Sequence, residues 1–420
     1  MGGLWNSTSA RAEDLTGARR AIVLGFLMIG YFFYAWAWNT VDILRPYIRD
    51  SVGMTMAQSG WLYSIQSTGA LVGALVMGQL ADRIGRRNAL VITMLGYGTL
   101  LLLGTVIDTF VQLAFERAAM GFFMGAMFPI VVGIYSGIFP SRSRGLIAGF
   151  IMATYNVSVA LLSYVSGKLV AAGYDWRIMF YAGVVPLIAA CFAFLLVPDD
   201  RRMTAWGEAD AAPRTAGRFP IAALLAPEYR QQTLALATMT GLNFFAYQAF
   251  TGWASTYLKD VREISPDLIG TVLAFQFIAS ALGGFAWGMI SDRMGRRKAA
   301  WGFVLAAIII PVYLFIPLSD PLFIALGFLY GFMLSASTIW GPWLSELYPS
   351  NLRATAASIF NWGRVVSILA PPLTAALVPA FGMAPVMMLG SVALLLAAGI
   401  WFTRRETVGT PIVPAVPART

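Results

Sequence analysis

Long apolar segments, separated by short polar ones, recur along almost the whole chain of 420 residues. A helix that crosses a membrane needs about 20 mostly apolar residues, because the hydrocarbon core is about 30 Å thick. Twelve segments meet this requirement, and each is predicted to be a transmembrane helix. They are Ala21–Pro46, Ser59–Ala81, Asn88–Asp108, Phe110–Phe139, Gly145–Ala172, Ile178–Val197, Gln232–Tyr257, Leu268–Ile290, Ala299–Leu318, Leu322–Leu344, Ala354–Phe381 and Pro385–Phe402.

The longest polar stretch, 199–230, separates six of these segments from the other six. It contains Gly, Pro and charged residues without helical periodicity, which is typical of a linker. The pattern predicts an all-α membrane protein with twelve transmembrane helices in two six-helix bundles. The predicted parts are an N-terminal bundle at 1–198, a linker at 199–230, a C-terminal bundle at 231–403 and a tail at 404–420.

Arg and Lys are distributed unevenly between the two sides of the predicted helices. About 21 of them lie in the tails and in the loops that follow even-numbered helices, against about five in the other loops. Because positive residues stay on the cytoplasmic side, both termini are predicted to be cytoplasmic, in a bacterial-type inner membrane. The first apolar run is too long for a signal peptide and is predicted to be retained.

The amino-acid composition excludes several classes of protein function. Apolar residues make up 58% of the chain and charged residues 12%, which excludes an ordinary soluble domain and makes the lipid bilayer the main surroundings. The net charge of +9 resides in short loops rather than on one basic face, so nucleic acid is not an expected partner. The single cysteine, Cys191, and the lack of histidine offer no metal cluster or nucleophile–base pair. No enzyme activity, metal or cofactor is therefore expected.

The loop after the second helix of each half carries the same motif. Gly78-Gln-Leu-Ala-Asp82-Arg83-Ile-Gly85-Arg86-Arg87 recurs as Gly288-Met-Ile-Ser-Asp292-Arg293-Met-Gly295-Arg296-Arg297. Phe139-Pro140-Ser141 with Arg144 likewise recurs as Tyr348-Pro349-Ser350 with Arg353. The chain is therefore predicted to be an internal duplication of parallel topology, with its halves related by a pseudo-two-fold.

These two loops resemble the major facilitator superfamily, whose loop reads roughly Gly-x-x-x-Asp-Arg-x-Gly-Arg-Arg in both halves. The resemblance implies the major facilitator fold, a central site reached alternately from each side, and a monomeric functional unit. Each motif residue is given a role by its chemistry. Gly78 and Gly288 are expected to let helices approach closely, Asp82 and Asp292 to accept hydrogen bonds at a helix N-terminus, and the arginines to remain in water. The loops are predicted to latch the outward-open state, the alternative being a tight turn with positive charges.

Charged residues inside membrane helices are costly, so they are candidates for function. Arg364 lies near the middle of the eleventh helix, where its guanidinium can grip a carboxylate through two parallel hydrogen bonds. It is predicted to bind an organic anion, the alternative being a structural ion pair. Asp42, Glu116 and Arg117 lie in the extracellular halves of their helices. With no histidine, a membrane proton carrier has to be a carboxyl group, so Asp42 and Glu116 are candidates. The alternative is a fixed ion network between the first and fourth helices.

Arg117 also begins the pattern Arg117-x-x-x-Gly121-x-x-x-Gly125, whose glycines predict close packing of the fourth helix. The family has a similar arginine linked to proton coupling, and the resemblance implies that role for Arg117. Neutral polar and aromatic residues at similar depth are predicted to complete the substrate cavity, the alternative for each amide being a bond between helices. They are Tyr34, Trp38, Asn39, Asn156, Asn243, Tyr247, Gln248 and Asn361.

Several further stretches resemble the metabolite–proton symporters, which import aromatic acids, sialic acid and short organic acids. They are Glu346-Leu-Tyr-Pro349, Asn361-Trp-Gly363-Arg364 and Asp175-Trp176-Arg177. Aromatic-acid members usually carry an Asp-Gly-x-Asp-like element where this chain has Tyr34-Ala35-Trp36-Ala37, so either Asp42 substitutes for its carboxylate or coupling follows another route. The resemblance implies import of an organic carboxylate, driven by the proton gradient without a cofactor. The alternatives are a proton-coupled efflux antiporter and a solute sensor that transports nothing.

Overall fold

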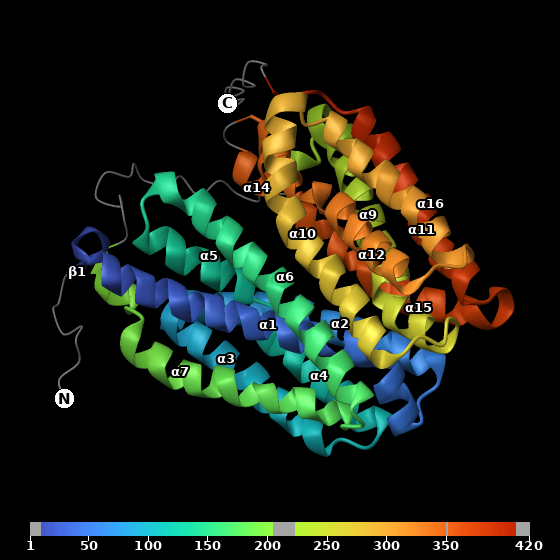
Figure 1. Ribbon diagram of the computed structural model, residues 1–420. Coiled ribbons are helices and arrows are strands. Elements are labelled where there is room, and N and C mark those ends of the chain that lie inside the picture. Colours follow the sequence, from blue (N-terminus) through green and yellow to red (C-terminus); the bar gives the residue numbers. More distant parts are fainter. Residues whose placement is uncertain (1–9, 205–222, 350–351, 409–420) are drawn as a thin grey trace. The chain divides into compact units, whose positions relative to one another are not determined.

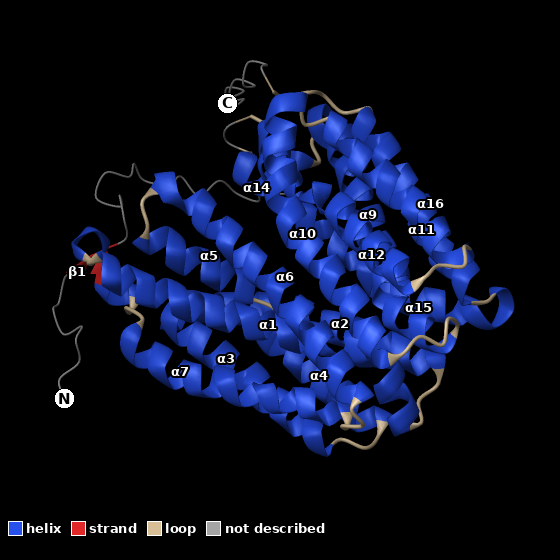
Figure 2. Cartoon of the chain, viewed as in Figure 1, coloured by secondary structure: helices blue, strands red, loops and turns tan. Residues whose placement is uncertain are grey.

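The computed structural model describes residues 10–204, 223–349 and 352–408. These residues form two compact units, one within 1–213 and the other within 214–420. Helices dominate both units (Figure 2). Among the described residues, the only strands are the two-residue β1 (Ala10–Arg11) and β2 (Met203–Thr204), which pair in parallel. The prediction of an all-α protein is confirmed apart from this short pair.

The N-terminal unit runs from blue to green in Figure 1. Short 3₁₀ turns at Gly104–Val106 and Trp176–Gly183 extend two of its helices, so that six crossings are present where six were predicted. Its helices are α1 (Gly17–Val52), α2 (Met56–Ile84), α3 (Arg86–Leu103), α4 (Phe110–Met124), α5 (Met127–Ile138), α6 (Ser141–Ala171) and α7 (Val184–Leu196).

The C-terminal unit runs from yellow-green to red and repeats this plan (Figure 1). Its 3₁₀ turns are Lys298–Ala300 and Ser335–Ile339. Its helices are α9 (Pro227–Asp260), α10 (Pro266–Met294), α11 (Trp301–Phe315), α12 (Asp320–Leu334), α13 (Trp340–Glu346), α14 (Arg353–Ala357), α15 (Ile359–Phe381) and α16 (Met383–Phe402). The seventh helix begins at Pro227, within the predicted linker, because proline is well suited to the first turn of a helix.

The same helix pairs pack together in both units. In the first unit α2 packs on α4, α1 on α6 and α3 on α7. In the second unit α10 packs on α12, α9 on α15 and α11 on α16, which are the matching pairs of the duplication. The fourth and tenth predicted helices are also interrupted at matching places, after Met124 and at Ser335–Ile339. The internal repeat read from the loops therefore extends to the packing of the helices.

Ten of the described helical segments are long and apolar enough to cross a membrane. The two crossings that fall short of this criterion are α2 and α9, which are rich in Gly, Ser, Thr, Asn and Gln. Several of their polar side chains are buried and hydrogen-bonded within the protein: Thr233 and Thr240 of α9, and Ser59 and Gln66 of α2. Both helices pack closely on neighbours, so a less apolar surface suffices for them.

Small residues explain the tightest of these contacts. A Cβ added at Gly121 would overlap the carbonyl of Gln66, and one at Gly125 would overlap the carbonyl of Ala70. The close packing predicted from the Arg117–Gly121–Gly125 pattern is therefore confirmed, with α2 as the partner helix. Gly78 and Gly288 behave differently, because an added Cβ at either position would meet nothing within 4 Å. The close approach predicted at these two motif glycines is absent from the structure.

Candidate functional site

Arg364 lies on α15, one residue beyond a point of close helix contact. A Cβ added at Gly363 would overlap the backbone of Thr240, so α15 approaches α9 most closely there. The Arg364 side chain is exposed, and its guanidinium carbon lies 5.5 Å from the centre of the Phe244 ring. Because weakly hydrated guanidinium groups stack well on aromatic faces, Phe244 holds the head group at a fixed place on the surface of its unit.

Two predicted amides lie on α9, close in sequence to Phe244. Asn243 is 7% exposed and Gln248 is 2% exposed. Among the described residues, no donor reaches Asn243 Oδ1 or Gln248 Oε1. Tyr247 is half-buried and shares a helix face with Asn243. A buried carbonyl oxygen without a donor is costly, so both amides are suited to accept a hydrogen bond from a ligand or water. The side chain of Asn361 lies outside the described residues.

The N-terminal unit gathers tyrosines around α1. Tyr34 stacks on Tyr31, with ring centres 5.2 Å apart, and both rings lie about 6 Å from Tyr155 on α6. The ring centre of Trp38 lies 6.0 Å from that of Tyr34, one turn further along α1. Asn39 donates a 2.9 Å hydrogen bond to the hydroxyl of Tyr155, which links α1 to α6. We call Tyr31, Tyr34, Trp38, Asn39 and Tyr155 the tyrosine cluster.

The structure separates Asn156 from this cluster. Its amide donates to the carbonyl of Met152, on its own helix, 3.3 Å away. The neighbouring Tyr155 reaches Asn39 instead, because adjacent residues on a helix point about 100° apart. Tyr31 and Tyr155 were not predicted. The sequence places these two tyrosines in the same predicted helices as Asn39 and Asn156, but the prediction considered the amides there and not these tyrosines.

The remaining charges of the predicted membrane helices form two buried pairs within the N-terminal unit. Glu116 receives two hydrogen bonds from Arg117, at 2.5 and 2.8 Å, and Arg117 also donates to the carbonyl of Ala37 on α1. Asp42 pairs with Arg45 of the next turn, and Arg45 donates 2.7 Å to the carbonyl of Ser59 on α2. Asp42, Arg45, Glu116 and Arg117 are all less than a tenth exposed. Each pair thus ties α1 to a neighbouring helix, α4 or α2.

The duplicated loops are held by carboxylates that were not predicted. Gly85 and Gly295 end α2 and α10 with positive φ values of 89° and 101°. The backbone N–H groups of Arg86 and Arg87 donate to Asp200, at 2.8 and 3.4 Å. Those of Arg296 and Arg297 donate to Glu406, at 2.8 and 2.9 Å. These carboxylates come from the segments after α7 and α16, and not from Asp82 or Asp292 of the motif.

The motif arginines also differ from expectation. Of the four arginines predicted to remain in water, Arg86 and Arg297 are exposed. Arg87 is half-buried, paired with Asp199 at 3.4 Å and stacked 4.8 Å over Phe194. Arg296 is half-buried as well, and it pairs with Asp292 at 2.6 Å and Glu346 at 3.3 Å. Long arginine side chains can pack their stems and still find a carboxylate, so a charge near a helix end need not extend into water.

Asp199 remains a carboxylate in this arrangement. Burial raises its pKa, but hydrogen bonds from Arg201 and the charges of Arg87 and Arg201 outweigh burial and leave the pKa below its ordinary value. The negative charge that holds Arg87 and Arg201 is therefore present at neutral pH.

Comparison with known proteins agrees with this architecture. The Major Facilitator Superfamily profile matches residues 27–265 and 234–419. A protein of Cupriavidus pinatubonensis named "Probable 4-methylmuconolactone transporter" is 28% identical, covering 80% of this chain and 79% of its own. The cis,cis-muconate transport protein of Acinetobacter baylyi is 24% identical, covering 77% and 79%. The gallate transporter of Pseudomonas putida is 26% identical, covering 80% of each chain.

Solved structures show the same fold. A bacterial homologue of the human lysosomal transporter Spinster superposes with a TM-score of 0.77 at 16% identity, covering 93% of this chain and 97% of that one. The duplicated loops, the matching helix pairs and the profile that spans both halves lead to one conclusion: this chain belongs to the major facilitator superfamily.

Proposed function

We propose that this protein imports a small organic carboxylate, of the class formed in the breakdown of aromatic compounds, together with protons. Transport proceeds by alternating access across the inner membrane, with both termini cytoplasmic. Relatives named for 4-methylmuconolactone, cis,cis-muconate and gallate support the substrate class, because they span the chain at similar identity. The uneven distribution of Arg and Lys supports the orientation.

The exposure of Arg364 is the observation that carries the proposal. Arg45 and Arg117, the other two arginines deep in the predicted helices, are 1% and 0% exposed and are bonded to acids of their own unit. Arg364 is an exposed residue, and its guanidinium carbon lies 5.5 Å from the centre of the Phe244 ring. A guanidinium binds a carboxylate through two parallel hydrogen bonds, and a nearby aromatic ring adds favourable contact for a planar substrate.

The tyrosine cluster of the N-terminal unit supplies the complementary chemistry. Its stacked rings offer flat apolar surface, and the tyrosine hydroxyls can form hydrogen bonds to hydroxyl or carbonyl substituents. An aromatic or conjugated acid presents both features. Within the C-terminal unit we assign recognition of a carboxylate to Arg364, and within the N-terminal unit the tyrosine cluster is a separate candidate for contact with an aromatic body.

Binding and uptake of a labelled acid such as 4-hydroxybenzoate test the proposal. We expect Arg364→Ala to weaken binding about tenfold or more, the effect of losing about 1.5–3 kcal/mol from a charge-assisted contact. Arg364→Lys keeps the charge but loses the paired hydrogen bonds, so its affinity should lie between the two. Arg293→Ala, in the exposed last turn of α10, is the control for lost positive charge. Unchanged affinity in Arg364→Ala, or uptake indifferent to an imposed pH gradient, would contradict the proposal.

A further inference from the structure

The duplicated loop of the C-terminal unit is hydrogen-bonded to the carboxylate of Glu346, and the N-terminal unit has no carboxylate at the matching position. Glu346, the last residue of α13, accepts a hydrogen bond from Arg296 at 3.3 Å and another from the hydroxyl of Thr407. Arg296 belongs to the duplicated loop, and Thr407 follows the capping Glu406. Glu346 thus joins the loop, the fourth helix of its half and the segment after α16.

The duplication identifies the matching positions in the N-terminal unit. Pro140 corresponds to Pro349, so counting back three residues from each proline pairs Gly137 with Glu346. Arg86 corresponds to Arg296 in the loop motif. Asp200 caps the first loop as Glu406 caps the second, so the residue after it, Arg201, corresponds to Thr407. The N-terminal unit therefore has an arginine, Arg86, at the position of Arg296. It has Arg201 at the position of Thr407, and Gly137 at the position of Glu346.

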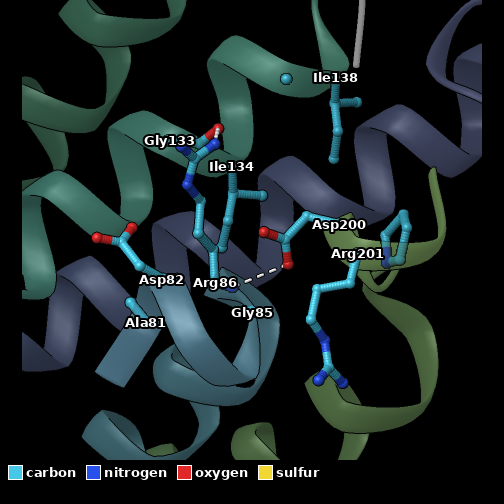
Figure 3. Close-up of a pocket in the computed structure, with 11 residues that line it drawn as sticks. Ala81, Asp82, Gly85, Arg86, Gly133, Ile134, Ile138, Asp200 and Arg201 are labelled. Atoms are coloured by element: carbon cyan, nitrogen blue, oxygen red, sulfur yellow. Dashed lines mark hydrogen bonds between the residues drawn. The ribbon is translucent and has the colours of Figure 1, made fainter. Parts of the chain in front are cut away.

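A cavity of about 220 Å³ lies where that carboxylate is missing (Figure 3). Its lining includes Arg86, Arg201, Gly133, Gly137, Ile134 and Ile138. The Arg86 guanidinium donates 3.0 Å to the carbonyl of Gly133 and, among the described residues, forms no ion pair. Arg201 lies at the same cavity and pairs with Asp199 at 3.2 Å. Within the described part of the chain, Arg86 thus lacks both of the carboxylate contacts that its counterpart Arg296 makes with Asp292 and Glu346.

We propose that this cavity is a second carboxylate site, in which a small organic acid takes the place that Glu346 occupies in the other half. The acid's carboxylate bonds to Arg86, and Ile134 and Ile138 contact its apolar part. Asp82 and Asp200 also line the cavity, so a monoanion is favoured over a dianion such as phosphate. In the proposed orientation the site faces the cytoplasm, where the imported acid is one candidate occupant.

Cysteine protection measures occupancy at the cavity itself. Gly137→Cys in a Cys191→Ser background places one thiol in the full-length protein, and its rate of reaction with N-ethylmaleimide is followed in detergent. We expect acetate and benzoate to slow the reaction in a saturable manner, while phosphate at equal ionic strength has little effect. Adding Arg86→Gln should raise the concentration needed for half protection about tenfold. Arg83→Gln, in the same duplicated motif but outside the cavity lining, should leave protection unchanged.

The Arg364→Ala background separates this site from the transport site. Protection by benzoate should persist there, whether or not the protein transports an acid. Equal protection in the Arg86→Gln variant, equal protection by phosphate, or none by either carboxylate would overturn the assignment.

Gly137→Glu provides a second measurement that does not depend on the engineered cysteine. In the Arg364→Ala background, benzoate should raise the unfolding temperature, because a ligand bound only to the folded state stabilises it. Gly137→Glu should abolish that rise by supplying the carboxylate within the chain. A rise that persists in Gly137→Glu would also overturn the proposal.

Discussion

Burial decides what each arginine of the membrane helices can do. Arg117 is 0% exposed and divides its hydrogen bonds between Glu116 and the backbone of α1, so it is part of the framework of its unit. Arg364 is exposed, with an aromatic ring beneath it. The first arginine is enclosed by its own unit, whereas the second is accessible to a ligand. Residue type alone does not distinguish these two cases.

Glu116 is the residue at which we expect proton coupling to be tested most directly. Glu116→Gln keeps the size of the side chain and removes the charge that Arg117 binds. We expect the variant to exchange labelled acid across a membrane but to lose accumulation driven by a pH gradient, because no carboxyl group remains to carry the proton. Counterflow and gradient-driven uptake in reconstituted vesicles measure the two activities. Asp42→Asn is the parallel variant for the other candidate.

Either of two results would contradict a role for Glu116. Full accumulation by Glu116→Gln would leave Asp42 as the candidate carrier. Loss of exchange together with accumulation would instead favour the structural alternative, in which the Glu116–Arg117 pair holds α4 against α1.

The sequence predicted candidate residues best where their chemistry is rare. Arg364 could be found because charges inside apolar segments are few. Asp200 and Glu406 could not, because they lie in polar segments where acids are common, and their contacts with Arg86 and Arg296 span more than 100 residues. Asn156 was predicted because of its amide. In the structure that amide donates to a carbonyl of its own helix, and the adjacent Tyr155, which points in another direction, bonds to Asn39 instead. Depth is readable from a sequence, but the direction of a side chain depends on packing.

At the scale of the element, glycine has two different uses in α2 and α4. Gly121→Val should be strongly destabilising, because its side chain would be driven into the backbone of α2 near Gln66. Overpacking of this kind typically costs about 1–3 kcal/mol. Gly78→Ala is the matched control, since an added Cβ there meets nothing within 4 Å and the fold should be unaffected. Unfolding temperatures of the purified variants measure the difference; equal temperatures for both would refute this account of helix packing.

The carboxylate caps of the duplicated loops make a prediction about pH. Burial raises the pKa of Glu406, but hydrogen bonds from the backbone N–H groups of Arg297, Val408, Arg296 and Thr407 outweigh it, and the pKa lies below its ordinary value. A lowered pKa in the folded state means stabilisation that is present above about pH 4.3 and is lost as the pH falls through the folded value.

Glu406→Gln tests this linkage. We expect a loss of about 0.5–1 kcal/mol at pH 7, as for other partly exposed helix caps, and a smaller difference from the wild type below about pH 4. Unfolding temperatures measured across this pH range provide the test, with the exposed Glu263→Gln as control. A difference that stays constant between pH 7 and pH 4 would show that the charge of Glu406 does not stabilise the loop.

At the scale of the whole molecule, the fold was predicted from two patterns, apolar length and internal repetition. Both hold even where individual helix ends are misplaced by several residues. Apolar length gave the number of crossings, although the observed ends differ by several residues and the breaks after Met124 and at Ser335–Ile339 were not predicted. Repetition gave the pairing of the halves, because two matching loops fix the register of two six-helix units. Neither pattern carries information about capping contacts or about the cavity beside Gly137, which arise from side chains brought together by packing.

The orientation of the chain yields the last prediction, which tests whether α9, one of the two least apolar predicted crossings, spans the membrane. Six crossings separate the loop after α2 from the loop after α10, so Arg83→Cys and Arg293→Cys, each in a Cys191→Ser background, should react with a membrane-impermeant thiol reagent from the same side. If α9 did not cross, five crossings would remain and the two loops would lie on opposite faces. Asp108→Cys and Asp320→Cys, in loops after odd-numbered helices, should react from the other side. Labelling of intact cells compared with inverted vesicles decides between these outcomes, and opposite faces for Arg83→Cys and Arg293→Cys would remove the parallel arrangement of the two halves on which alternating access depends.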